Sequence, residues 1–187
     1  MTEDELIDDV FRKEGDEYGD QTTHPPIDQP TGRGGITLGT LRAYINTTGS
    51  PIAGTVTTLK ALTRDQAEDI VRWKLRADAK RNRFDEIAFE PLRLQMVDFA
   101  YNSGPSLAIR WLQRVLRVPR TGAMDNATFA VLETYAADPF VQFLIQQALI
   151  AARLEMVDRW TDGDAKAKMW EEGVESRGLS FSLLEVP

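Results

Sequence analysis

Apolar residues recur at helical spacing along most of the chain. The first segment begins with Thr2 and Glu5 in the arrangement of a capping box, in which each side chain bonds the other residue's backbone. The apolar residues that follow on one helical face are Leu6, Ile7, Val10 and Phe11. This pattern predicts a helix over residues 3–14 that stops before Gly15.

The same periodicity, together with start and stop signals, predicts further helices. Thr63 and Gln66 have the spacing of a second capping box, Pro91 suits the first turn of a helix, and Asp125 is a typical N-cap. The predicted ranges are 37–45, 63–80, 91–101, 126–137, 140–160 and about 165–175. A further helix is expected after the break at residues 103–105, with Ile109, Leu112, Val115 and Leu116 on its inner face. Only 18–37 and 52–58 have a composition compatible with strands, so we expect a mainly α fold with at most a small β element near residues 18–37.

The composition narrows the possible chemistry. The 187 residues include no cysteine and a single histidine, His24, which lies in a polar loop where we expect it to be exposed. Disulfides and thiolate metal sites are excluded, and a serine–histidine triad or a multi-histidine zinc site is disfavoured. We therefore expect no metal and no cofactor, and any catalysis would rest on carboxylates.

The overall charge and hydropathy narrow the possible partners. A formal net charge of −7 argues against nonspecific nucleic-acid binding. No stretch approaches the ~18 consecutive apolar residues of a membrane span, so we expect no membrane insertion. The N-terminus is acidic and helix-patterned, unlike a secretory signal, which predicts synthesis in the cytoplasm without a signal peptide.

Charge is unevenly distributed along the chain. Acidic residues crowd the first twenty positions, whereas residues 72–83 read RWKLRADAKRNR and four arginines follow at 110, 114, 117 and 120. Two interpretations of the basic run remain open: a solvated helix face, or a surface that contacts an anionic polymer.

Glu14 ends the first predicted helix directly before glycine and a polar loop. The C-terminal end of a helix is negative and disfavours a second negative charge, and partial burial against Phe11 would favour the protonated carboxyl further. A protonated carboxyl near neutral pH is what a glycosidic oxygen needs from a general acid. The alternative is a surface glutamate at a helix end, which is a common feature.

The loop after Glu14 carries the other groups that glycoside hydrolysis uses. A second carboxylate normally stabilises positive charge or activates water across the cleft. The nearby candidates are Asp16, Glu17, Asp20 and Asp28, each of which has a solvated or turn-capping role as its alternative. Glycines at 32, 34 and 35 would let backbone approach a sugar, and the hydroxyls of Thr31 and Thr37 could hold a water.

These residues are similar to a known family. The letters KEGDEYGDQ…DQPTGRGGITLGTL resemble the N-terminal signature of the glycoside hydrolase family 108 N-acetylmuramidases, which begins Glu-Gly-Gly and continues through Asp-x-Gly-Gly-x-Thr to Gly-Ile-Thr. The stretch QMVDFAYNSGPSLAIRWLQRVLRVPRTGAMDNATFAVL resembles that family's companion segment, a predicted peptidoglycan-binding region. The two matches together span residues 10–132.

The resemblance implies a lysozyme-like α (α+β) fold that cuts the β-1,4 bond between N-acetylmuramic acid and N-acetylglucosamine in peptidoglycan, typically as a phage or prophage endolysin. It implies that residues 1–90 form the muramidase region with the catalytic loop, that 91–187 form a helical peptidoglycan-binding-like region, and that both pack as one compact unit. The protein would act as a monomer on glycan strands of the cell wall or periplasm, with a separate holin as the candidate export partner.

The resemblance also implies site residues. Glu14 takes the place of the catalytic acid, and Asp28 and Thr31 follow in the order Glu, Asp, Thr that lines the cleft of phage-type lysozymes; Asp20 is the other candidate for the second carboxylate. The expected substrate-binding residues are Asp20, Tyr18, Tyr101, Asn102 and Gln113. Core packing of Tyr101, capping of a helix C-terminus by Asn102 and backbone hydrogen bonding by Gln113 are the structural alternatives.

The sequence departs from the family pattern at two glycine pairs. Gly15-Asp16 stands where the family has Gly-Gly after the glutamate, and Asp28-Gln29 stands where it has Gly-Gly before the threonine. These departures favour an alternative function, a catalytically inactive cell-wall-binding or phage structural protein of the same fold. Retention of Glu14 between lysine and glycine favours the enzyme.

Overall fold

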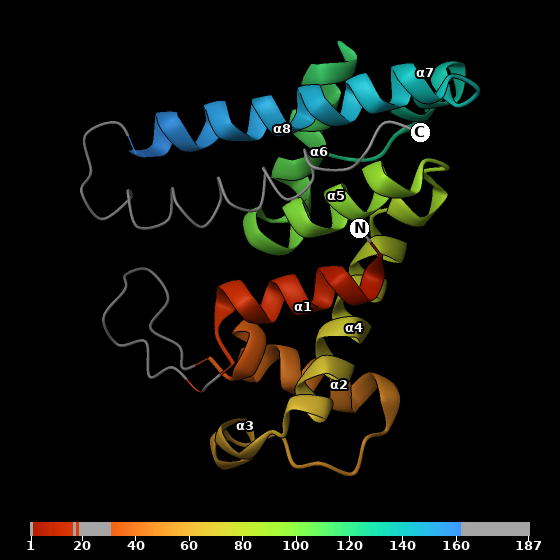
Figure 1. Cartoon of the computed structure of the whole chain (residues 1–187). Helices are drawn as coiled ribbons and strands as arrows, with labels where there is room; N and C mark the ends of the chain where they lie inside the picture. The colour runs from red at the N-terminus through yellow and green to blue at the C-terminus, as the bar shows by residue number, and fades with distance from the viewer. Residues whose placement is uncertain (1, 17, 19–30, 162–187) are drawn as a thin grey trace. The chain divides into compact units, whose positions relative to one another are not determined.

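The computed structural model describes residues 2–16, 18 and 31–161, with side chains up to residue 156. The elements, in chain order, are α1 (Glu3–Glu14), the 3-10 helix η1 (Arg33–Gly35), α2 (Leu38–Thr48), α3 (Val56–Ala61), α4 (Arg64–Arg81), the 3-10 helix η2 (Phe84–Glu86), α5 (Glu90–Ser103), α6 (Pro105–Leu116), α7 (Asn126–Tyr135) and α8 (Pro139–Thr161). Figure 1 shows these helices and the connections between them. The helix predicted at 165–175 lies outside the described residues.

The predicted fold class is confirmed, because the described residues are mainly helical. Their only β feature is an isolated antiparallel bridge between Thr31 and Thr37, within the region where a small β element was expected. The possibility of a strand at 52–58 is wrong, since Val56 begins α3. The hydroxyl of Thr55 accepts a hydrogen bond from the amide of Thr58 and so caps the N-terminus of α3. This cap stabilises a helix although the composition of the segment is typical of a strand.

The chain divides into two compact units. One comprises Thr2–Ala77 and the other begins at Asp78, so the division falls near the end of α4. The functional boundary at 90/91 that the resemblance implies stays a prediction. Packing of the two regions as one compact unit stays a prediction, and each unit is described by itself below.

In the unit Thr2–Ala77, ion pairs join α1 to α4. A capping box between Thr2 and Glu5 begins α1, as predicted. Arg72 lies 2.8 Å from the carboxylate of Asp4, and Arg76 lies 2.7 Å from that of Glu3. The buried apolar side chains of this unit include Leu6, Ile7, Val10, Phe11, Leu41, Leu59, Ile70 and Val71. The first unit therefore combines an apolar interior with a charged seam along its first helix.

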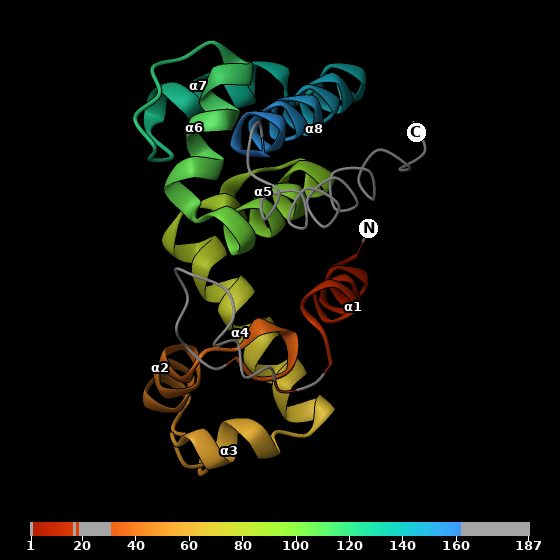
Figure 2. The same cartoon turned by 90° about the vertical axis from the view of Figure 1, so that its left-hand side faces the viewer.

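In the unit that begins at Asp78, α5 packs against α6 and α8, and α6 also contacts α7 and α8. Figure 2 shows these four helices together in a view turned from that of Figure 1. A buried ion pair links α5 and α8: Arg153 Nη1 lies 2.6 Å from Asp98 Oδ2, and each side chain is 1% exposed. The centre of the Phe99 ring lies 4.9 Å from the Arg153 guanidinium carbon, so an aromatic ring lies beside this buried pair.

Within the described residues, no helix has both the length and the apolar character needed to cross a membrane.

Candidate functional site

Glu14 is the last residue of α1, as predicted, and its side chain is exposed. The helix ends because Gly15 adopts a φ of 89°, a conformation that favours glycine, while its amide still donates a 3.0 Å hydrogen bond to the carbonyl of Phe11. The partial burial of Glu14 expected against Phe11 is wrong: Phe11 is itself buried and leaves the carboxyl at the surface. Glu14 therefore lies at the surface of its unit and not in the apolar interior.

The carboxyl group of Glu14 lies against the backbone of Gly35 in η1. A Cβ atom at position 35 would lie 3.1 Å from Glu14 Oε2 and 3.4 Å from its Cδ, and Gly35 has a φ of 73°. A residue with a side chain would thus be strained by its own backbone and crowded by the carboxyl. Glycine at position 35 thus suits both the positive φ and the close approach of the Glu14 carboxyl.

Backbone hydrogen bonds hold this loop beside the end of α1. The amide of Gly34 donates to the carbonyl of Gly15 over 2.9 Å, and the amide of Gly32 donates to the carbonyl of Ile36 over 2.7 Å. Thr37 then begins α2, because its hydroxyl accepts a 3.1 Å hydrogen bond from the amide of Thr40. The hydroxyl expected to hold a water thus serves as a helix cap.

Arg33 ties the loop to Asp16. Its guanidinium donates to the carbonyl oxygen of Asp16 and, over 2.9 Å, to the Asp16 carboxylate, while its Nε donates to the carbonyl of Leu62 over 2.9 Å. Arg64 approaches the same carboxylate at 3.6 Å and lies 3.7 Å from the centre of the Phe11 ring. Asp16, which stands where the family has glycine, is therefore a structural anchor of the loop.

The remaining glycines of the loop serve the protein's own packing. A Cβ atom on Gly34 would lie 3.0 Å from the ring of Phe11 and 3.2 Å from Val71, and one on Gly32 would lie 2.8 Å from Leu59. Our expectation that these glycines leave room for a sugar is corrected for Gly32 and Gly34. They leave room for apolar side chains of the same unit.

The other predicted residues of the loop are only partly described. Asp28, Asp20 and His24 lie outside the described residues, so their roles stay predictions. Thr31 is half-buried in its bridge with Thr37. Tyr18 is half-buried, and the ammonium group of Lys60 lies 4.8 Å from its ring centre, so a sugar stacking on that face would have to displace Lys60.

Three predicted substrate-binding residues belong to the other unit. Tyr101 and Asn102 are half-buried in α5. The expected left-handed cap at Asn102 is wrong, because the helix continues to Ser103 and the cap is Gly104, with a φ of 82°. The Asn102 amide group donates instead to the carbonyl of Asp98, over 2.8 Å.

Gln113 is completely buried in α6 and its side-chain amide is used within the protein. Its Nε2 donates to the carbonyl of Ala123 over 2.9 Å and to the hydroxyls of Thr121 and Thr128, and its Oε1 accepts from the amide of Gly122 over 2.9 Å. These bonds fix the loop between α6 and α7. The structure thus gives Gln113 a structural role, and contact with a substrate would require these bonds to break.

Most arginines of the basic run at residues 72–83 form ion pairs with acidic residues of the same chain. Arg72 and Arg76 pair with acidic residues of α1, Arg81 lies 3.8 Å from Asp78, and Arg83 lies 2.7 Å from Glu86. This arrangement argues against a surface that contacts an anionic polymer through this run.

The sequence analysis missed Arg33, which fixes the geometry around Glu14. The available signal was its position inside Gly-Arg-Gly-Gly, together with the aspartate that replaces a family glycine. Chemically, the arrangement presents one carboxyl group at a helix end, on a loop whose backbone position is fixed by hydrogen bonds. A carboxyl group is one of the side chains that general acid–base catalysis uses.

No protein-family model matches the chain, and no curated protein matches it. Among solved structures, the chain is similar to a protein described as Brucella abortus SagA, with 29% sequence identity and a TM-score of 0.59. The match covers 98% of this chain and 97% of that one, so both described units are included in it. The resemblance to the family 108 muramidases stays a prediction.

Proposed function

We propose that this protein is a peptidoglycan hydrolase, a lysozyme-like N-acetylmuramidase that cleaves the β-1,4 bond between N-acetylmuramic acid and N-acetylglucosamine. The observation that carries the proposal is the contact between the Glu14 carboxyl and Gly35. Two stretches of the motif, separated by twenty residues of sequence, meet at one exposed carboxyl group. A motif that served only the core would have no need to present this carboxyl to solvent.

In this proposal Glu14 acts as general acid and protonates the glycosidic oxygen as the bond breaks. A second carboxylate, which the sequence assigns to Asp28, stabilises the positive charge on the sugar or activates a water. Thr31 is the candidate for holding that water. The chemistry requires no metal and no organic cofactor.

The test compares wild type with Glu14→Gln on purified peptidoglycan, by release of reducing ends. Removal of a general acid is expected to lower the rate by about 100-fold or more. Glu133→Gln is the matched control, since Glu133 is also an exposed glutamate in a helix, and it should retain wild-type activity. Equal activity of wild type and a folded Glu14→Gln variant would remove Glu14 from the mechanism.

A second candidate function is a catalytically inactive cell-wall-binding or phage structural protein. The exposure of Glu14 favours it, because general acids of glycosidases typically lie in a cleft with apolar walls. Wild-type protein that pellets with peptidoglycan but releases no reducing ends, at any pH from 4 to 8, would decide for this candidate.

The biological setting remains a proposal as well. A phage or prophage endolysin made in the cytoplasm reaches the wall only after release, for which a separate holin is the candidate. Action as a monomer is the expectation, and sedimentation of the purified protein tests it.

A further inference from the structure

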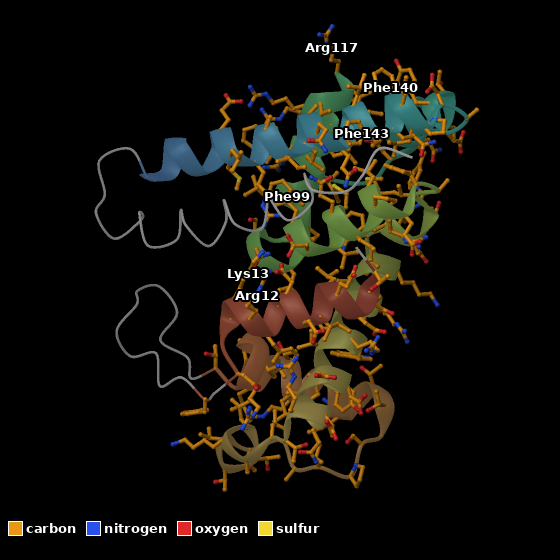
Figure 3. All side chains as sticks on the ribbon, in the orientation of Figure 1. Arg12, Lys13, Phe99, Arg117, Phe140 and Phe143 are labelled. Atoms are coloured by element: carbon orange, nitrogen blue, oxygen red, sulfur yellow. The ribbon has the colours of Figure 1, made fainter. Side chains whose placement is uncertain are left out.

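Four arginines gather at the C-terminal end of α6. Arg110, Arg114 and Arg117 are spaced i, i+4, i+7, so they follow one face of the helix. Arg120 follows in the next loop, and both its guanidinium and that of Arg114 lie near the Trp111 ring, at 5.7 and 4.7 Å from the centroid. Arg117 points away from the ribbon at the helix end (Figure 3). We call these four residues the arginine stripe.

The arginine stripe is exposed, and most of it has no acidic partner. Arg114 pairs with Glu155, but no ion pair of Arg110, Arg117 or Arg120 is present in the part of the chain that the structure describes. Elsewhere, every arginine whose side chain is described forms an ion pair, except Arg42. The arginines so paired are Arg12, Arg33, Arg64, Arg72, Arg76, Arg81, Arg83, Arg93 and Arg153.

This contrast is unexpected for a chain with 29 acidic and 22 basic residues. Neighbouring like charges on a helix face repel one another, and acidic residues were available to balance them, as they do along α4. The negative C-terminal end of α6 stabilises a cation in its last turn, but this effect falls off within one turn and does not account for four. An anion from outside the protein would balance the charge.

The one paired arginine indicates the chemistry of that anion. Arg114 Nη2 lies 3.1 Å from one carboxylate oxygen of Glu155 and 2.8 Å from the other, so it holds a carboxylate through both oxygens. A guanidinium presents its donors in a planar fork that suits such oxyanions. Arg110, Arg117 and Arg120 offer the same fork to solvent.

The surface of the arginine stripe argues against other partners. The exposed large apolar side chains of the described residues are Val56, Tyr135, Phe140 and Leu144, and none belongs to it. A membrane surface or a protein partner normally gains affinity from such side chains. Trp111 is only 6% exposed, so it offers no platform on which a nucleobase could stack.

We infer that the arginine stripe is a docking surface for the carboxylates of peptidoglycan stem peptides. This inference rests on the proposed function, which makes peptidoglycan the target. From Arg110 to Arg117 the stripe extends about 10 Å along the helix axis, enough to engage several carboxylates of the peptides on one strand. The arginine stripe would bind the peptide part of peptidoglycan, whereas the reaction proposed for Glu14 takes place on the glycan part.

The experiment measures pelleting with purified peptidoglycan at low salt, in a Glu14→Gln background that prevents turnover. The test variant carries Arg110→Gln, Arg117→Gln and Arg120→Gln. The control variant carries Arg42→Gln, Lys80→Gln and Arg81→Gln, which removes the same charge from exposed positions elsewhere. Each lost exposed ion pair should weaken binding about twofold, so the test variant should bind about tenfold more weakly and the control should not.

A second arm uses peptidoglycan whose carboxylates have been blocked by amidation, and a third uses vesicles of anionic phospholipid. The unsubstituted arginine stripe should bind amidated peptidoglycan as weakly as the test variant binds the native polymer. Equal binding by the test and control variants, undiminished binding to amidated peptidoglycan, or stronger binding to vesicles than to peptidoglycan would each overturn the inference.

The outcome is separable from that of the proposed function. If wild type releases no reducing ends but binding still depends on the arginine stripe, the hydrolase proposal fails and the docking surface stands. If wild type cleaves peptidoglycan but substitution of the arginine stripe leaves binding unchanged, only the inference about the docking surface is wrong.

Discussion

The carboxyl group of Glu14 lies against the backbone of Gly35, and a Cβ atom on residue 35 would be 3.1 Å from Glu14 Oε2. Residues from the two ends of the predicted catalytic loop are thereby brought into contact. A side chain at position 35 would crowd the carboxyl where it now lies, and this can be tested directly.

We expect Gly35→Ala to lower peptidoglycan hydrolysis strongly, because the added methyl group must displace the Glu14 carboxyl. Gly49→Ala is a matched control: its φ of 71° is close to the 73° of Gly35, but nothing lies within 4 Å of the added Cβ. Both substitutions should cost about 1 kcal/mol or more of stability through backbone strain. Reducing-end release by folded protein should therefore fall only for Gly35→Ala, and an equal fall in both variants would contradict the positioning of Glu14 by Gly35.

The ion pair between Asp98 and Arg153 should be costly to break from one side. Asp98→Ala leaves a guanidinium that is 1% exposed, and whose Nε and Nη2 already lack hydrogen-bond partners in the described structure. We expect a loss of about 3–5 kcal/mol in the free energy of unfolding, measured with urea. Asp98→Leu combined with Arg153→Met should recover most of this loss; a double variant as unstable as the sum of the single variants would argue against a desolvated pair.

Gln113→Leu separates a structural role from a ligand-binding one. The substitution removes the partner of the Gly122 amide and one of the three donors to the Ala123 carbonyl, and we expect about 1–3 kcal/mol of destabilisation in urea. Binding of peptidoglycan per folded molecule should be unchanged. Weakened binding at unchanged stability would restore the substrate-binding role that the sequence suggested.

The pair between Glu3 and Arg76 predicts a pH dependence of stability. The hydrogen bond from Arg76 lowers the pKa of Glu3 from its ordinary value of 4.5. A carboxyl whose pKa is lower in the folded state stabilises the fold above its unfolded pKa, and this contribution is lost as the pH falls through the folded pKa. Glu3→Gln should therefore destabilise the protein at pH 7, by less than about 1 kcal/mol because the pair is partly exposed, and have no effect near pH 2.

Thermal unfolding of wild type and Glu3→Gln across this pH range checks the prediction. Glu133→Gln serves as the comparison, because no ion pair of Glu133 is present among the described residues. A difference between wild type and Glu3→Gln that persists at pH 2 would mean that Glu3 stabilises the protein by something other than its charge.

Local signals in the sequence predicted the helices well. Thr2, Thr63 and Asp125 each cap the helix that follows, as expected, because a cap needs only a side chain and a backbone amide two or three residues away. The short helix α3 was missed, since six residues are too few for a periodic pattern to outweigh their strand-like composition.

The sequence did not predict which charged residues form ion pairs with one another. The run at 72–83 has the composition of a free basic surface, yet Arg72 forms an ion pair with Asp4, 68 positions earlier in the chain. In the arginine stripe, by contrast, only Arg114 has an acidic partner among the described residues. Charge interactions act between neighbours in space, and the fold decides which charges become neighbours.

The sequence by itself determined the helical fold class, the helix ends and the position of Glu14 at the end of α1, because these depend on hydrogen bonds and apolar spacing within a few residues. Only the tertiary structure decided that Glu14 is exposed and lies against Gly35, that Gln113 is buried in a hydrogen-bond network and that Arg110, Arg117 and Arg120 form no ion pair among the described residues. Burial and contact between distant residues follow from the packing of whole helices, which no local pattern encodes.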